Sequence, residues 1–275
     1  MKALIFVDME GISGIVHSSE TNPERYDYQR GRELMTAEAN AVIAGVLDAE
    51  PTADVLVADA HGTFRNLLPE QLDRRARLVR GKPRALNMLA GLDEETDAAL
   101  FVGYHVRAGE GPGVLAHTMN GEILDVRVAG RSLGEIGLNA AMAGHLGVPV
   151  VLLSGDDAAC AEAAALIPEA VTVPVKEALG MAAAVTLHPE EARDRLRRAA
   201  ADAVSRRTEI PSLALTGPVD VEVDLASPHT IDLATLIPGV SRTAGARTVA
   251  FTAPDYGTAY RLILLLAQLA TIRPA

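Results

Sequence analysis

The chain of 275 residues carries 36 acidic and 25 basic side chains, a formal net charge of −11, and 49% of its residues are hydrophobic. This length and apolar content predict a folded protein of one large or two modest domains and exclude an intrinsically disordered chain. The negative charge argues against a nucleic-acid or anionic-membrane partner, because both attract a concentrated positive surface. The single cysteine, Cys160, cannot form an intramolecular disulfide, so we expect any metal to be bound by His and carboxylate side chains.

Neither end of the sequence predicts a targeting or membrane segment. The apolar stretch before Asp8 is too short for the hydrophobic region of a secretory signal. The longest apolar run, Leu262 to Ala270, is interrupted by Gln268 and is shorter than the ~20 residues that span a bilayer. We therefore expect a cytoplasmic protein.

Short apolar runs alternate with longer helical segments over the first part of the chain, which is typical of β-α units around a parallel sheet. The segment 122–129 has the alternating pattern of an extended chain, with Gly121 and Gly130 at its ends, and is expected to form a hairpin or an edge element. The predicted strands are 3–7, 54–58, 97–104 and 148–153, and the predicted helices are 30–49, 133–146 and about 158–166.

The pattern changes beyond about residue 170. A charged helix over 189–207 precedes an alternating strand over 219–225, a short strand near 248–251 and a terminal helix from about Thr258. The predicted fold class is α/β: a mostly parallel sheet with helices on both faces, plus a smaller mixed α/β domain. We expect residues 1–160 to form a metal-binding catalytic domain and residues 161–275 to form the smaller domain and contribute to oligomerisation.

Side chains that suit metal binding follow each of the first three predicted strands. Asp8 and Glu10 follow the first strand, His61 the second and His105 the third. Taken singly, the two carboxylates are better explained as turn or capping groups, and each histidine as a core or surface residue. The carboxyl ends of parallel strands meet at one edge of a sheet, however, so the recurrence predicts one metal site there.

Two further candidates have competing interpretations. Glu135 lies three residues after Ser132, a spacing that by itself favours a capping box at a helix start. His117 follows a glycine-rich loop, 107–113, that matches no phosphate-binding fingerprint and is expected to be a flexible active-site loop. His117 is then either a general acid/base or an ordinary polar loop residue. Asp156 or Asp157 is expected to cap the following helix, and the remaining histidines are expected to be structural: His17, His145, His188 and His229.

Several of these segments together resemble the DppA-type zinc D-aminopeptidases, in order over roughly the first 175 residues. The matching segments are 7–14, 30–40, 103–105, 117–119 and 134–140, and Val-Asp-Met-Glu-Gly-Ile-Ser-Gly is the most specific of them. The resemblance implies a binuclear zinc site with these ligands: Asp8, Glu10, His61, His105 and Glu135. It makes Asp8 the bridging carboxylate, changes Glu135 from a cap to a ligand, and places His117 beside the metals for catalysis. Ala60 stands where a serine is expected in a relative, so one neighbouring hydrogen bond is in doubt.

The resemblance also implies an activity and an assembly. It predicts hydrolysis of short peptides with an N-terminal D-amino acid, such as D-Ala-D-Ala, inside a homodecamer with an internal chamber. Two divalent cations roughly 3.5–4 Å apart can activate a shared water and polarise an amide carbonyl, which fits this chemistry. The alternatives are a metal-dependent amidase or phosphoesterase, and a non-catalytic metal- or peptide-binding accessory protein of a transport system.

Overall fold

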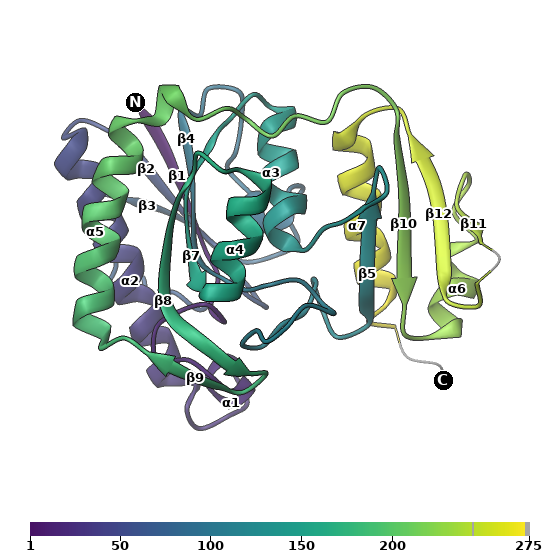
Figure 1. Ribbon diagram of the computed structural model, residues 1–275, viewed down its shortest axis with the longest axis horizontal. Coiled ribbons are helices and arrows are strands. Elements are labelled where there is room, and N and C mark those ends of the chain that lie inside the picture. Colours follow the sequence, from purple (N-terminus) through teal and green to yellow (C-terminus); the bar gives the residue numbers. More distant parts are fainter. Residues whose placement is uncertain (244, 273–275) are drawn as a thin grey trace.

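The computed structural model describes residues 1–243 and 245–272, which form two β-sheets with helices packed around them (Figure 1). In the larger, seven-stranded sheet the strand order is β3-β2-β1-β4-β7-β8-β9, and every neighbouring pair is parallel except β8 with β9. Its strands are β1 (Lys2–Val7), β2 (Asp54–Asp59), β3 (Arg77–Val79), β4 (Ala98–Tyr104), β7 (Val150–Asp156), β8 (Val171–Gly180) and β9 (Ala183–Thr186). Strands β4 and β7 are buried along their whole length, as expected for central strands covered on both faces.

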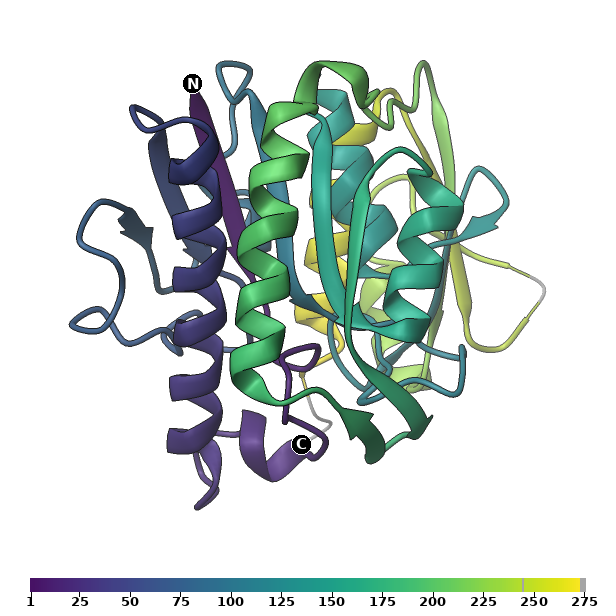
Figure 2. The same cartoon turned by 60° about the vertical axis from the view of Figure 1, so that its left-hand side comes forward.

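Helices cover both faces of this sheet. Helices α2 (Tyr28–Ala49) and α5 (Pro189–Ser205) lie side by side on one face, as Figure 2 shows, and α3 (Glu135–His145) and α4 (Asp157–Leu166) lie on the other. A Cβ atom at Gly45 of α2 would lie 2.2 Å from the carbonyl oxygen of Arg197, so glycine allows α2 and α5 to approach closely. Asp156 caps α4 by accepting a hydrogen bond from the Ala159 amide, which confirms the predicted cap.

The smaller sheet is antiparallel, with the order β11-β12-β10-β5-β6. Helix α7 (Tyr256–Leu269) lies between this sheet and α3, and so joins the two parts of the molecule (Figure 1). The strands are β5 (Ile123–Val128), β6 (Arg131–Ser132), β10 (Val219–Leu225), β11 (Ser241–Arg242) and β12 (Thr248–Ala253). The remaining short elements are α1 (Ser18–Thr21), α6 (Pro228–Ala234) and the two 3-10 turns Asn87–Leu89 and Arg207–Glu209.

The predicted α/β fold class is confirmed, with a mostly parallel sheet, helices on both faces and a smaller mixed α/β part. The predicted division at residue 160 does not follow the sheets, because β8, β9 and α5 belong to the larger sheet and its cover, whereas β5 and β6 belong to the smaller sheet. The segment 122–129 forms a hairpin with β6, as predicted. No strand was expected at β3, β8 or β9.

In the part of the chain that the structure describes, no helix combines the length and the apolar character needed to cross a membrane.

Candidate metal centre

The loop after β1 places two carboxylates at the carboxyl edge of the larger sheet. The amides of Asp8 and Gly11 each donate a hydrogen bond of 2.8 Å to β4, to the carbonyls of Val102 and Gly103. A Cβ atom on Gly11 would lie 1.9 Å from the Tyr104 carbonyl oxygen, so the loop reaches this position only with glycine there. Asp8 is 2% exposed and Glu10 is 5% exposed, so neither is an ordinary turn carboxylate in water.

The loop after β2 brings His61 to these carboxylates. Asp59, the last residue of β2, accepts hydrogen bonds from the amides of Asn66 and Leu67 and so fixes the loop. The Nε2–H of His61 donates to the Thr21 carbonyl at 2.9 Å, because a carbonyl can only accept. The Nδ1 atom of His61 therefore faces inward, 3.0 Å from Oε2 of Glu10 and 3.3 Å from Oδ1 of Asp8.

His105 follows β4 directly and is fixed in the same way. Its Nδ1–H donates to the Val106 carbonyl at 3.1 Å, which turns Nε2 toward the carboxylates. This Nε2 atom lies 3.5 Å from Oδ2 of Asp8 and 3.4 Å from Oε1 of Glu135. His105 is 1% exposed, so its ring is fully enclosed.

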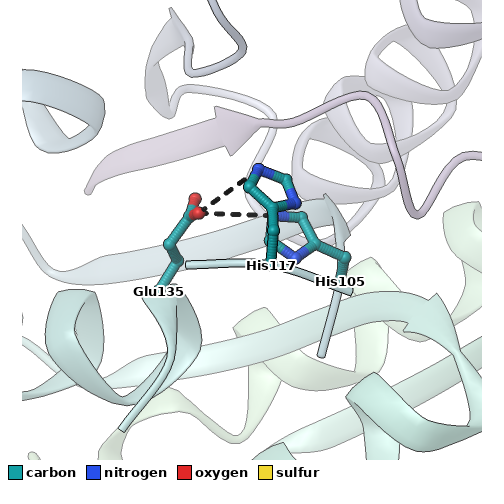
Figure 3. Close-up of side chains that lie close together, drawn as sticks. All are labelled: His105, His117 and Glu135. Atoms are coloured by element: carbon teal, nitrogen blue, oxygen red, sulfur yellow. Dashed lines mark ion pairs between the residues drawn. The ribbon is translucent and has the colours of Figure 1, made fainter. Parts of the chain in front are cut away.

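Glu135 is the first residue of α3 and points into the same region (Figure 3). The capping-box interpretation is wrong: the N-cap is Gly134, which makes no side-chain cap, and the Ser132 hydroxyl donates to Asp125 instead. Oε1 of Glu135 accepts a hydrogen bond of 2.6 Å from the Met119 amide. Glu135 thus faces the candidate metal centre and does not cap its own helix.

His117 lies over His105, with ring centroids 4.0 Å apart and 12° between the ring planes. Its Nδ1–H donates to the Leu115 carbonyl at 2.8 Å, which leaves Nε2 toward the centre, 3.8 Å from Oε1 of Glu135 (Figure 3). Two nearby residues, Leu115 and Met119, have the left-handed backbone conformation, with φ of 53° and 62°. Such conformations are costly outside glycine and are held by the surrounding structure, which is common at functional sites.

All six candidate residues named from the sequence thus lie together, and their donor atoms suit a metal. Among the described residues, Oδ2 of Asp8, Oε2 of Glu10 and Nε2 of His105 are buried without a hydrogen-bond partner. Two overlapping groups have donor atoms within 4.8 Å of one another: Asp8, Glu10 and His105, and His105, His117 and Glu135. Buried polar atoms are nearly always satisfied in folded proteins, so unpaired carboxylate oxygens beside imidazole nitrogens fit bound divalent cations.

The pKa shifts of the residues at this centre also indicate that its carboxylates favour a positive charge nearby. Burial and the neighbouring Glu10 raise the pKa of Asp8 to about 7. Burial alone would lower the pKa of His105, but the carboxylates of Glu135 and Asp8 raise it to about 10. Burial and the proximity of His105 lower the pKa of His117. Carboxylates packed this closely keep the neighbouring imidazoles protonated, unless a bound metal ion supplies the positive charge instead of the protons.

The centre opens into a cavity of about 120 Å³. Asp8, His61, His117 and Glu135 line one side, and Ala267 and Gln268 of α7 line the other. The amide side chain of Asn120 donates to the Ala267 carbonyl at 2.9 Å and holds α7 against the loop that carries His117. The pocket is therefore lined by loops that follow strands of the larger sheet, by the start of α3 and by the last helix.

Sequence reasoning missed Lys176 of β8, which supports the loop after β1. Its buried ammonium donates hydrogen bonds to three backbone carbonyls, those of Glu10, Ile12 and Ile15, at 2.6, 2.9 and 2.6 Å. Burial lowers the pKa of Lys176 to about 8, so the group stays protonated at neutral pH. The one signal in the sequence is a lysine directly after the apolar run 173–175, and it cannot be interpreted until β8 is known to run beside this loop.

The glycine-rich loop lies elsewhere than predicted. Arg107, Glu110, Gly111 and Pro112 line another cavity of about 430 Å³ beside α4 and do not line the pocket of the metal centre. The other histidines have structural positions, as expected: His17 and His188 cap α1 and α5, and His145 and His229 lie within α3 and α6.

The carboxyl edge of a parallel sheet is where such folds bind their ligands, and the buried carboxylates and imidazoles there suit a metal-dependent hydrolase. The chain belongs to the D-aminopeptidase family of peptidases, whose sequence model matches residues 1–265. A D-aminopeptidase of Bacillus subtilis (strain 168) is 37% identical to it over 270 residues, which cover 98% of each protein. The solved structure described as the Zn-dependent D-aminopeptidase DppA from Bacillus subtilis, a self-compartmentalizing protease, has a TM-score of 0.96 at 36% identity and covers 100% of both chains. The protein is a metallo-aminopeptidase.

Proposed function

We propose that this metallo-aminopeptidase uses two zinc ions per subunit to remove N-terminal D-amino acids, of the D-alanine type, from short peptides. The observation that carries the proposal is the set of buried, unpaired donor atoms on Asp8, Glu10 and His105 at one edge of the sheet. A carboxylate and an imidazole buried without partners cost free energy, and a bound divalent cation would recover it.

Five side chains would hold the two ions: Asp8, Glu10, His61, His105 and Glu135. Asp8 is suited to bridge, because its Oδ1 faces His61 at 3.3 Å and its Oδ2 faces His105 at 3.5 Å. Donation from His61 to Thr21 and from His105 to Val106 fixes which nitrogen of each ring binds. When bound, zinc supplies Lewis-acid polarisation of the scissile carbonyl and activates water for attack on it.

His117 would move the proton. Its Nδ1–H is held by the Leu115 carbonyl, so Nε2 is the atom that accepts a proton and gives it to the amine that leaves. The stacked ring of His105 keeps this nitrogen in place at the pocket that His117 helps to line.

The preference for D-residues and the assembly are supported by the relatives. Both similar proteins of Bacillus subtilis are described as D-aminopeptidases, and one as self-compartmentalizing. We propose a homo-oligomer, a decamer, in which residues 161–275 contribute contacts between subunits. Native mass spectrometry should give a particle of ten chains, and a monomer would contradict this part of the proposal.

The activity is tested with a panel of D- and L-alanyl dipeptides and p-nitroanilides, each assayed with added zinc and with a chelator. Turnover of the D-substrates that is lost with chelator and restored by zinc is the expected result, with about two zinc ions per chain by elemental analysis. Turnover of L-substrates alone, or turnover insensitive to chelator, would overturn the proposed function.

A further inference from the structure

A second cavity adjoins the pocket of the metal centre. It has a volume of about 410 Å³ and shares four lining residues with that pocket: Phe64, Lys82, Asn87 and Gln268. The two hollows therefore lie side by side, and we call them together the groove, with the metal centre in its inner part. A peptide with its scissile bond at the centre would extend into the outer cavity.

The two ends of this groove differ in charge. The inner pocket is lined by the carboxylates of Asp8 and Glu135. The outer cavity is lined by three cations, Lys82, Arg84 and Arg261, and the described residues place no carboxylate in its lining. A short peptide at neutral pH is a zwitterion, with an ammonium group at one end and a carboxylate at the other, and it matches this polarity when its amino end lies at the metal centre.

Of the three cations, only Lys82 lines both cavities. The Arg84 guanidinium is engaged by the carbonyls of Asp59, Val79 and Asn87. It also stacks on the Phe64 ring, 4.0 Å from the centroid. Three of the five N–H donors of Arg84 are thus engaged, its planar group is held against Phe64, and it does not line the inner pocket, so it contributes positive charge to the outer cavity alone.

Lys82 is the more exposed of the two residues, and its Nζ lies farther from the Phe64 ring, 5.6 Å from the centroid. Its Nζ donates one hydrogen bond, of 2.9 Å, to the carbonyl of Gly62, the residue after His61. An ammonium group has three N–H donors, so two remain for a ligand in the groove. The contact with Gly62 keeps the charge beside the loop that supplies a metal-binding histidine.

We propose that Lys82 binds the free C-terminal carboxylate of the peptide and so makes the enzyme prefer short peptides that carry one. The inference rests on the proposed function, since it takes the metal centre as the point of cleavage. Lys82 is a specificity-determining residue in this arrangement, because a peptide amide or an anilide offers no charge for it to bind.

The test compares D-Ala-D-Ala with its C-terminal amide on the zinc-loaded enzyme and three variants. Lys82→Met should lower kcat/KM for the free acid about 10- to 100-fold, the effect of one charge-assisted hydrogen bond, mostly through KM. It should change kcat/KM for the amide by less than about threefold, and Lys82→Arg should restore most of the preference for the acid. Lys2→Met removes an equal charge from a surface ion pair with Asp93 and is the matched control.

Equal losses for acid and amide, or no loss for either, would overturn the role of Lys82 while leaving the proposed function intact. Failure of the unaltered enzyme to cleave both substrates would refute the proposed function and the inference with it. Circular dichroism of Lys82→Met and Lys82→Arg shows whether a loss reflects unfolding, in which case the arginine variant carries the comparison.

Discussion

His105 and His117 stack with ring centroids 4.0 Å apart, yet their inward nitrogens have different neighbours. Nε2 of His105 lies 3.5 Å from Asp8 and 3.4 Å from Glu135, whereas Nε2 of His117 approaches Glu135 alone, at 3.8 Å. His117 is also the more exposed, at 28% of its side chain against 1% for His105. This difference fits the roles proposed for the two rings, His105 as a metal ligand and His117 as the residue that faces substrate.

The first prediction follows from that difference. His105→Ala should lose zinc, measured by elemental analysis after dialysis, because it removes a donor from both groups of candidate ligands. His117→Ala should keep its zinc and lose about 100-fold or more in kcat, the usual contribution of a positioned acid or base. His229→Ala, in the smaller sheet's helix α6, is the control for both measurements. Loss of zinc from His117→Ala would instead make His117 a ligand.

Lys176 should matter for stability as well as for activity. Lys176→Met leaves three buried carbonyls without their donor, and each such group costs about 1–3 kcal/mol. We expect the free energy of unfolding to fall by at least about 3 kcal/mol in urea titrations. Zinc affinity should fall with it, because the loop from Glu10 to Ile15 loses its anchor. A variant as stable as the control Lys2→Met would show that the loop holds its position without Lys176.

Gly11 tests how closely the first loop must approach β4. A methyl group there would meet the Tyr104 carbonyl at 1.9 Å, so Gly11→Ala must displace the loop that carries Asp8 and Glu10. A lower melting temperature and weaker zinc retention are expected, with a cost of about 2 kcal/mol or more. Gly121→Ala is the matched control, because no atom lies within 4 Å of its added methyl group. Equal melting temperatures for the two variants would contradict the tight contact.

The smaller sheet contains a pH-dependent ion pair. Arg127 of β5 donates hydrogen bonds of 2.7 and 2.9 Å to Asp224 of β10, and this guanidinium lowers the pKa of Asp224. A carboxyl whose pKa is depressed on folding stabilises the protein above its unfolded pKa of about 3.9, and that contribution is lost as pH falls through the folded pKa. Since the pair is partly exposed, Asp224→Asn should cost about 1 kcal/mol at pH 7 and much less at pH 3.

Chemical denaturation at the two pH values measures this difference. Asp54→Asn, which breaks the exposed pair with Arg77, should have little effect at either pH. A cost of Asp224→Asn that is the same at pH 3 and pH 7 would show that hydrogen bonding alone, without charge, accounts for the pair.

The sequence predicts the strands whose ends carry the chemistry, because their apolar runs are long and each is followed by a metal-binding residue type. It could not predict β8, in which Pro174 and Lys176 interrupt the apolar pattern, or β3, which has only three residues. Local sequence also favoured a cap at Glu135, since the spacing from Ser132 matches a capping box. Only the tertiary structure shows that Ser132 bonds to Asp125 and leaves Glu135 facing the centre.

The wall that α7 gives to the pocket has a consequence for biosynthesis. Asp8 and Glu10 leave the ribosome long before Ala267 and Gln268, which also line the pocket. A nascent chain that stops short of α7 has the metal-binding edge without the opposite face of the groove. Peptide hydrolysis therefore has to wait for the synthesis of α7, because a chain without this helix lacks part of the pocket that holds the peptide.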